Sequence, residues 1–461
     1  MKTTTQKLWI LFFLTTSASC GPDLDKEDQI ELGEIQLEES NEPSDETTQE
    51  TNEPPLSGDD TDSSGNENLS YENLKKYLDE KVASGSIHGY SYQLFNSNDE
   101  LLLDAEAGTC SSSVSFCPYG DQSFTAELET KIASSTKWVS STVILAAVDE
   151  LISSGRISSV QEGLSQTVGN VLGAKCTNKN IGRGKEVTLR QLLSFTSGLI
   201  PDHSCVKSST LSKTECACQI LAESAAVETD NPKETPASKL SHPPGTTYKY
   251  GSSHLTIAGA MIEIATGESF ESIFQRLVAS KINFSGTYTA GRSNNLAGGM
   301  KASTSEFVKF VRAMYHAGQN PNVPALISTE AQLEQESPQT SEQTEFLISP
   351  RRGFDYGLNI WRACYKPHTL ADLEALTSET YPTLIDPNCS AVVQIGHGGK
   401  GGYTPFIDRK RGIYGVFAIR EASPGGGAQY TQESTGLTTY VKLYSGLVAD
   451  QKNEATASPS N

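Results

Sequence analysis

The sequence predicts a mixed α/β fold of the α+β type: an antiparallel sheet flanked by N- and C-terminal helices, with a mainly helical domain inserted between its halves. Two observations lead to this prediction. Strand patterns occur near both ends of the folded region, at residues 90–95 and 101–105 and again at 392–395, 403–407 and 413–419. The long stretch between them has mainly helical periodicity. Strands from the two ends are therefore expected to meet in one sheet.

Local patterns define the terminal elements. Apolar residues recur at helical spacing from Tyr71 to Val82, before Gly85, and predict the first helix. Residues 96–99, Asn-Ser-Asn-Asp, favour a turn and predict a hairpin between the first two strands. Residues 432–448 predict the closing helix. No internal repeat is present in the sequence.

Composition narrows the class of protein. The 461 residues include 36 Lys+Arg and 56 Asp+Glu, for a formal net charge of −20, and 36% are hydrophobic. These values exclude a basic nucleic-acid-binding protein and a multispan membrane protein. Residues 21–70 hold 17 of the acidic residues beside a single lysine. We therefore expect an acidic, disordered tether at 21–69, a folded domain at 70–448 and a polar tail at 449–461.

Residues 1–20 have the pattern of a secretory signal peptide. Lys2 and Lys7 precede an apolar run at 8–14 that is too short to cross a bilayer, and small residues then end in Cys20. This end resembles a bacterial lipobox, whose cysteine becomes a diacylated first residue. The resemblance implies export and a lipid anchor in the cell envelope, with the folded domain periplasmic or extracellular. Gly21 and Pro22 follow Cys20 without the Asp that signals inner-membrane retention in many such lipoproteins, so we expect the outer membrane or surface. The alternative is ordinary signal cleavage, which leaves Cys20 as a free or paired thiol.

Eight cysteines remain once Cys20 is assigned to the anchor, and an even number in an exported protein suggests up to four disulfides. We expect Cys110 to pair with Cys117, which closes a short loop after the first hairpin, and Cys364 to pair with Cys389, which fixes the segment before the His397 strand. The other four are expected to pair among themselves in one of three ways: Cys176, Cys205, Cys216 and Cys218.

Ser134 and Lys137 open an apolar segment that predicts an amphipathic helix through Leu151. At spacing i, i+3 the two side chains share a helical face, so the lysine amine can take the serine hydroxyl proton. The positive end of the helix stabilises negative charge near its first turn. The alternative is an N-capping serine followed by an exposed lysine. A second Ser-x-x-Lys, from Ser204 to Lys207, lies in polar sequence with no apolar helix after it.

Two later segments complete a pattern. Residues 250–252, Tyr-Gly-Ser, precede an apolar helix, and residues 396–403, Gly-His-Gly-Gly-Lys-Gly-Gly-Tyr, lead into two strands. Together with Ser-Ser-Thr-Lys at 134–137, they resemble the serine β-lactamase and penicillin-binding-protein superfamily, in the branch of class C β-lactamases, D-Ala-D-Ala carboxypeptidases and related esterases. That family carries Ser-x-x-Lys, Tyr-x-Asn and Lys- or His-x-Gly in this order. The resemblance covers about residues 70–448 and includes the mid-chain segment 187–199.

The resemblance implies a serine hydrolase that forms an acyl-enzyme, without metal or organic cofactor. Ser134 is the expected nucleophile, and Lys137 and Tyr250 the residues that share the proton transfers. The backbone N–H groups of Ser134 and Lys400 form the expected oxyanion hole, where glycine lets the strand approach the substrate closely. The residues expected to line the substrate and oxyanion site are Ser252, His397, Gly399 and Lys400.

Several positions depart from the family pattern. Ser252 replaces the usual Asn, whose amide contacts the substrate in relatives, and Gly398 replaces a hydroxyl residue that helps to hold a substrate carboxylate. His397 in place of Lys carries less fixed positive charge at neutral pH. Phe195 stands where His is frequent. The expected substrates are small esters, amides or D-Ala-D-Ala-type peptides, including those derived from peptidoglycan. A true β-lactamase and a non-catalytic surface binding protein that keeps the fold are the alternatives.

Other chemistries lack their patterns in this sequence. It contains no Gly-x-Ser-x-Gly motif, its seven histidines show no metal-binding spacing, and no phosphate-binding glycine loop follows a predicted strand.

The polar segment between Gly198 and Pro243 directly precedes Tyr250. It either shapes the entrance to the site or is an insertion away from it. The sequence leaves the oligomeric state open and predicts no nucleic-acid partner.

Overall fold

The computed structural model describes residues 72–110, 121–289, 295–340, 344–349, 355–363 and 394–421. The signal peptide with Cys20, the acidic tether, the closing helix at 432–448 and the polar tail lie outside these ranges. The predicted disulfide between Cys364 and Cys389 also lies outside them. Within the described ranges, no helix is long and apolar enough to span a membrane.

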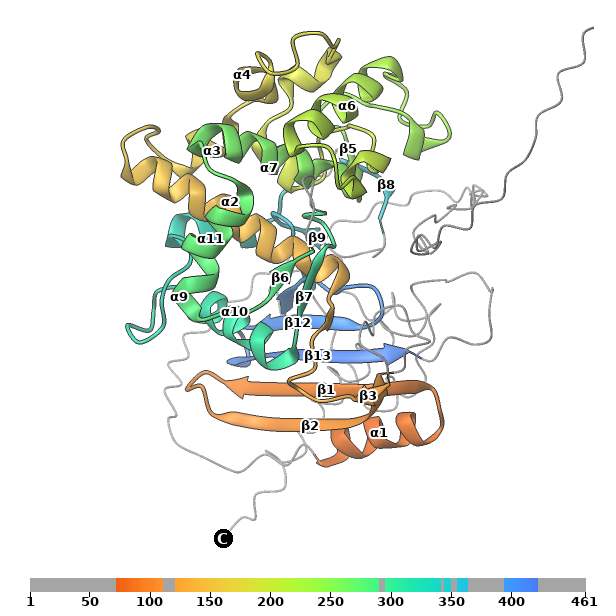
Figure 1. Ribbon diagram of the computed structural model, residues 1–461, viewed down its shortest axis with the longest axis vertical. Coiled ribbons are helices and arrows are strands. Elements are labelled where there is room, and N and C mark those ends of the chain that lie inside the picture. Colours follow the sequence, from red (N-terminus) through yellow and green to blue (C-terminus); the bar gives the residue numbers. More distant parts are fainter. Residues whose placement is uncertain are drawn as a thin grey trace, which may run out of the picture. The chain divides into compact units, whose positions relative to one another are not determined.

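In the described part of the chain the largest sheet is antiparallel and has eight strands (Figure 1). Its N-terminal hairpin joins the C-terminal strands because β1 pairs with β13, where Tyr92 lies opposite Phe417. This pairing confirms the predicted sheet built from both ends of the folded region. In spatial order the strands are β3 (Gln122–Ser123), β2 (Leu101–Cys110), β1 (Ile87–Asn96), β13 (Ile413–Glu421), β12 (Tyr403–Asp408), β11 (Gln394–Gly396), β10 (Trp361–Ala363) and β9 (Asp355–Tyr356).

The turn between β1 and β2 forms as its residue types predict. Asn96 Oδ1 accepts hydrogen bonds from the N–H groups of Asn98 and Glu100, at 2.9 and 3.0 Å. Asp99 has a φ of +65°, a conformation that Asp and Asn tolerate better than most residues. The side chain of Asn96 thus replaces part of the main-chain hydrogen bonding in the turn.

The two faces of the sheet belong to different apolar clusters. Along β13, Val416 points into one cluster and Phe417 into the other. Helix α10 (Thr304–His316) packs against β12 and β13 on the Val416 side. Helix α1 (Glu72–Ala83) packs against β1 and β2, and its Leu78 shares the cluster of Phe417. Helices therefore cover both faces, which explains why β13 is a nearly continuous run of buried residues and does not alternate between apolar and polar ones.

The chain between the two halves of the sheet is mainly helical, as predicted. It also contains a small antiparallel sheet of β4 (Thr130–Lys131), β7 (Met300–Ala302) and β6 (Thr287–Tyr288), and β5 (Thr247–Lys249) pairs in parallel with β8 (Glu345–Ile348). The α-helices of this region are α2 (Thr136–Ser153), α3 (Val160–Ser165), α4 (Val168–Leu172), α5 (Leu189–Leu193), α6 (Lys213–Ala226), α7 (Ser253–Thr266), α8 (Phe270–Phe274), α9 (Ser280–Ile282), α10 and α11 (Thr329–Glu336).

Helix α2 is not amphipathic, and the prediction that it would be is wrong. Residues 136–148 are all buried. Their hydroxyl groups are satisfied by main-chain oxygens: Ser140 Oγ donates to Leu296 O at 2.7 Å, and Thr142 Oγ1 donates to Trp138 O at 3.0 Å. Ser and Thr hydroxyl groups can donate hydrogen bonds to backbone carbonyls and can therefore be buried. Polar residues thus do not mark an exposed face of this helix.

Two disulfides join the four mid-chain cysteines, Cys176 to Cys218 and Cys205 to Cys216. This selects one of the three predicted connectivities. Both bridges end on α6, so they attach two upstream segments to that helix, which packs against α7. Cys110 is disulfide-bonded too, and its predicted partner Cys117 lies outside the described residues.

Candidate active site

Ser134 and Lys137 lie side by side at the start of α2. Lys137 Nζ lies 3.0 Å from Ser134 Oγ and donates a hydrogen bond to Ala297 O at 2.8 Å. Ser134 belongs to the 3-10 turn η2 (Ala133–Ser135) and not to α2 itself. A 3-10 turn also brings residues i and i+3 onto one side, so the predicted contact still forms. Only 4% of Lys137 is exposed, so the alternative of an exposed lysine is wrong.

Backbone contacts fix the turn that carries Ser134. Ala133 has a φ of +45°, in the left-handed region that residues with a Cβ rarely adopt. Thr136 Oγ1 donates to Ala133 O at 2.6 Å and accepts a hydrogen bond from Met300 N–H at 3.2 Å. Ile132 N–H donates to Met300 O at 3.1 Å. Strand β7 therefore holds the strained turn in place.

Burial lowers the pKa of Lys137 to about 7, although the negative charge of Asp202 opposes the shift. About half of the amine is therefore neutral at pH 7. A neutral amine can accept the hydroxyl proton of Ser134 while its own N–H still donates to Ala297 O. The site thus contains a base in hydrogen-bond reach of a potential nucleophile.

The Tyr250 ring lies beside the Lys137 amine, with Nζ 4.5 Å from the ring centroid. Tyr250 stacks on Trp361 and His397, with ring centroids 6.0 Å apart in both pairs and interplanar angles of 22° and 26°. Phe195 packs edge-on against Tyr250 at a centroid distance of 5.2 Å. The structure therefore brings Lys137, Tyr250 and His397 into one continuous set of contacts.

Phe195, which departs from the family pattern, is a packing residue in this structure. It is buried and has a φ of +59°. Besides Tyr250, its ring contacts Tyr248 edge-on at 6.1 Å and Tyr356 in a stacked arrangement at 5.3 Å. Because aromatic rings have few rotatable bonds, this cluster gives Tyr250 a rigid support.

His397 lies within the same aromatic cluster and is completely buried, at 0% exposure. Its Nε2 lies 3.2 Å from the Tyr356 hydroxyl, and its Nδ1 lies 3.0 Å from Gly398 O. Both ring nitrogens are thus within hydrogen-bond distance of protein atoms. The structure supports a role for His397 in positioning Tyr250, and direct contact with a substrate stays a prediction.

The loop after β11 lies against the Ser134 turn, and Gly399 makes this close approach possible. A Cβ atom on Gly399 would lie only 2.1 Å from Ile132 O. The neighbouring Ser135 Oγ donates to Tyr403 O at 3.1 Å, which joins the same two segments. Lys400 follows Gly399 directly, so its peptide group belongs to the loop that packs on the turn.

The buried Arg420 side chain also connects the segment before Ser134 with the loop that contains Lys400. Its guanidinium donates to Lys131 O at 3.0 Å, to Gly401 O at 3.2 Å and to Ile419 O at 2.7 Å, and the residue is 0% exposed. Lys131 ends the strand before Ser134, and Gly401 follows Lys400. One buried, always charged group therefore fixes the loop relative to the turn.

Ser252 lies beside the site, at the N-terminal end of α7, and is bonded to Asp202. Its N–H and its Oγ both donate to Asp202 Oδ1, at 2.9 and 2.5 Å. Pro201 O accepts a hydrogen bond from Ser253 N–H at 2.9 Å, and a Cβ on Gly251 would lie 2.1 Å from the same oxygen. The chain at Pro201 and Asp202 is therefore packed against the segment that carries Tyr250.

Lys249 anchors the polar segment between Gly198 and Pro243. Its buried amine donates to Gly198 O at 2.8 Å and to Leu240 O at 2.7 Å, and burial lowers the pKa of Lys249 to about 7. The two ends of the segment are thus held together next to Tyr250, whereas its helix α6 packs on α7. The segment borders the site at Asp202 and otherwise belongs to the helical region.

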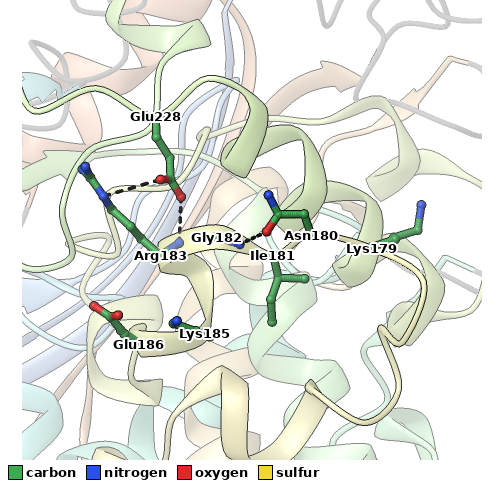
Figure 2. Close-up of a pocket in the computed structure, with 8 residues that line it drawn as sticks. All are labelled: Lys179, Asn180, Ile181, Gly182, Arg183, Lys185, Glu186 and Glu228. Atoms are coloured by element: carbon green, nitrogen blue, oxygen red, sulfur yellow. Dashed lines mark hydrogen bonds and ion pairs between the residues drawn. The ribbon is translucent and has the colours of Figure 1, made fainter.

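Two other features lie apart from these contacts. The second Ser-x-x-Lys forms its own 3-10 turn, η4 (Ser204–Lys207), and includes a disulfide cysteine. A hollow of about 410 Å³ lies at the turn η3 (Gly182–Glu186), where Arg183 and Glu228 form an ion pair at 3.5 Å (Figure 2). None of the predicted site residues lines it.

Among the described residues, no group of three or more His, Cys, Asp or Glu side chains is placed to hold a metal ion.

Four contributors to the site were not predicted from the sequence: Asp202, Ala297, Trp361 and Arg420. Ala297 contributes a main-chain oxygen, so its side chain carries no signal. Trp361 and Arg420 lie in strands. The apolar residues around them indicate that the strands are buried, but they do not indicate a functional site. Asp202 lies just after the mid-chain segment 187–199. This position was the one feature of the sequence that could have indicated its place at the site.

The substitution Gly399→Ala tests the packing of the loop on the Ser134 turn. The added methyl group meets Ile132 O, so one segment has to move, and we expect the free energy of unfolding to fall by about 1 to 3 kcal/mol. Denaturant unfolding measures this change. Gly298→Ala is the matched control, because a Cβ there would have its nearest neighbour at 3.5 Å. Equal stability of both variants would contradict the described contact.

Known proteins share the fold of this chain. The model of the Beta-lactamase family matches residues 120–438, whereas a search of curated proteins gave no match. Among solved structures, a Bacteroides dorei DSM 17855 protein with a provisional beta-lactamase assignment is 22% identical, with a TM-score of 0.58, over 82% of this chain and 98% of that chain.

Two further structures have the same fold. A penicillin-binding protein homologue from Caulobacter crescentus is 14% identical, with a TM-score of 0.56, over 82% of this chain and 97% of that chain. The D-amino acid amidase from Ochrobactrum anthropi SV3 is 14% identical, with a TM-score of 0.55, over 83% and 98%. The family model spans more than half of the sequence, and the antiparallel sheet with its helices matches the fold of this family. The chain therefore belongs to the beta-lactamase family, within the serine β-lactamase and penicillin-binding-protein superfamily.

Proposed function

We propose that the protein is a serine hydrolase that works through an acyl-enzyme on Ser134. The observation that carries this proposal is the buried Lys137 amine, which lies 3.0 Å from Ser134 Oγ and whose pKa burial lowers to about 7. Such an amine can act as a general base for the serine hydroxyl near neutral pH. Membership of the beta-lactamase family supports the same assignment.

In the acylation step, Ser134 Oγ attacks the carbonyl carbon of an ester or amide while its proton passes to Lys137 Nζ. The tetrahedral intermediate then breaks its C–O or C–N bond, and the leaving group takes up that proton. Tyr250, whose ring lies beside Lys137 Nζ, shares this transfer. In the second step water attacks the acyl carbon and gives a proton to the same base. The bond between that carbon and Ser134 Oγ then breaks, Oγ takes up the proton, and the acid product leaves.

The carbonyl oxygen gains negative charge in both steps and needs hydrogen-bond donors. We assign this role to the main-chain N–H groups of Ser134 and Lys400. The close approach of Gly399 to Ile132 O supports the assignment, because it brings the Lys400 loop beside the serine turn. The first turn of α2 adds favourable positive potential near Ser134.

The proposed substrates are small esters, amides and D-Ala-D-Ala-type peptides. The hydroxyl of Ser252 already donates to Asp202, and Gly398 has no side chain, so these positions offer few groups to hold a peptide or a β-lactam carboxylate. An ester also demands less protonation of its leaving group than an amide does. Both arguments favour small esters over β-lactams.

We also propose that the protein is exported and held in the cell envelope by a lipid on Cys20. The apolar run at residues 8–14 and the small residues that follow it support this proposal. The acidic stretch after Cys20 then serves as a spacer between the anchor and the catalytic domain.

The substitution Ser134→Ala should abolish hydrolysis and labelling by a fluorophosphonate. Stability should fall by no more than about 1 to 2 kcal/mol, because only one hydroxyl at a helix start is removed. Intact-protein mass spectrometry measures the label. Ser204→Ala, in the second Ser-x-x-Lys, is the matched control and should keep both properties. Retained turnover in Ser134→Ala would sink the mechanism, and an unlabelled wild type would favour the non-catalytic binding protein.

The pH dependence of kcat/KM should report the Lys137 amine. Its charged form, which cannot accept a proton, dominates below the pKa of about 7. We therefore expect kcat/KM for a neutral ester to rise with pH and to be about tenfold lower at pH 6 than on its plateau. Lys137→Arg should be inactive throughout, because arginine stays charged. A flat profile between pH 5.5 and 8.5 in the wild type would argue against Lys137 as the base.

Substrate preference separates the esterase from the β-lactamase alternative. We expect kcat/KM to decrease from p-nitrophenyl butyrate to a diacetyl-Lys-D-Ala-D-Ala peptide and then to nitrocefin. The expected order follows from leaving-group quality and from the few polar groups at Ser252 and Gly398. Steady-state kinetics on the three compounds gives the ranking. Faster turnover of nitrocefin than of the ester would make the protein a β-lactamase.

The proposed attachment of the protein to the membrane depends on the Cys20 side chain. Cys20→Ser should move the protein from the membrane fraction to the soluble fraction, because the thiol that carries the lipid is lost. Fractionation with mass spectrometry of the N-terminus checks this. Unchanged fractionation, without an acyl mass on the wild type, would refute the lipid anchor.

A further inference from the structure

Asp202 is an exposed carboxylate held at the edge of the candidate site. Its Oδ1 accepts two hydrogen bonds from Ser252, at 2.9 Å from N–H and 2.5 Å from Oγ. Ser252 is two residues from Tyr250, and Tyr250 lies beside the Lys137 amine. Asp202 is therefore fixed in orientation by the segment that also carries a proposed catalytic residue.

The second oxygen of Asp202 is available to a ligand. In the part of the chain that the structure describes, Oδ2 has no hydrogen-bond or ion-pair partner. Ser252 Oγ gives its one proton to Asp202, so it offers no donor to a substrate. Beside Ser252, the chain thus presents an exposed acceptor with a negative charge.

In the part of the chain that the structure describes, no basic side chain forms an ion pair with Asp202. Lys137 is buried, and its pKa is lowered to about 7, with the Asp202 charge acting on it from a distance. His254 is buried, and burial lowers the pKa of its ring to about 3, so it is neutral. His203 pairs with Glu223 at 2.9 Å. The surroundings of Asp202 therefore favour a positively charged ligand group.

We propose that Asp202 makes the site selective for acyl groups that carry a protonated amine near the scissile carbonyl, as in aminoacyl esters and amides. This inference rests on the proposed function of Ser134 as the acylated nucleophile. The ammonium of such a substrate donates a charge-assisted hydrogen bond to Asp202 Oδ2 while the carbonyl carbon meets Ser134 Oγ. An acyl group with a carboxylate in the same position is repelled.

The test compares methyl esters that differ only in the amine. The three probes are phenylalanine methyl ester, as separate D and L forms, its N-acetyl derivative, and methyl 3-phenylpropionate, which lacks the nitrogen. An ammonium group also activates an ester chemically, so the informative quantity is the kcat/KM ratio of amine to amine-free ester in the wild type and in each variant. Product formation is followed by chromatography at neutral pH.

Asp202→Asn keeps an oxygen that accepts from Ser252 and removes the charge. We expect the ratio to fall by about tenfold or more in Asp202→Asn, in line with the strength of a hydrogen bond to a charged group. Asp202→Glu, which keeps the charge, should retain most of the preference. Asp230→Asn removes another exposed carboxylate, which pairs with Arg183 at 2.8 Å, and should leave the ratio unchanged.

The outcomes distinguish this inference from the proposed function. An equal ratio in the wild type and Asp202→Asn, with Ser134-dependent hydrolysis of p-nitrophenyl butyrate intact, overturns the amine selectivity alone. A parallel loss on all esters, with no change in the ratio, also overturns it and assigns Asp202 a structural role. Absence of Ser134-dependent hydrolysis of every ester overturns the proposed function and this inference with it.

Discussion

Burial of the Lys137 amine is the constraint on which the rest of the site depends. An ammonium group removed from water loses hydration that few hydrogen bonds can replace, so the protein shifts the group toward its neutral form. The two contacts of Nζ, with Ser134 Oγ and Ala297 O, suit a neutral amine, which can accept from one and donate to the other. The buried first turn of α2 keeps this lysine away from water.

The parts of the site are held by contacts between segments far apart in the sequence. Phe195 supports Tyr250 from one side, and Trp361 and His397 stack on it. Arg420 joins the strand before Ser134 to the loop that contains Lys400, through the main-chain oxygens of Lys131 and Gly401. Such interlocking limits motion of the groups that must meet a substrate, and a rigid arrangement of donors is what stabilises a developing charge most effectively.

The sequence predicted the sheet built from both ends of the folded region and the local contacts, but it did not predict the side-chain contacts between distant segments. The turn at Asn96 and the contact of Ser134 with Lys137 depend on residues close in sequence, and both appear in the structure. The burial of α2 was not predictable, because serine and threonine side chains that bond to backbone oxygens look polar in a sequence. The bond from Lys137 to Ala297 O spans 160 residues and ends on a main-chain atom, so no residue pattern encodes it.

The central claim is that Lys137 is a partly neutral base at physiological pH, and its titration tests this most directly. NMR spectra of protein labelled with ¹³C and ¹⁵N in lysine follow each side-chain amine with pH, and the Lys137→Arg variant identifies the signal by its loss. The buried Lys249 is assigned in the same way with Lys249→Met. We expect the pKa of Lys137 to be about 7, as its burial dictates. A titration near the ordinary lysine value, about 10.4, would contradict the account.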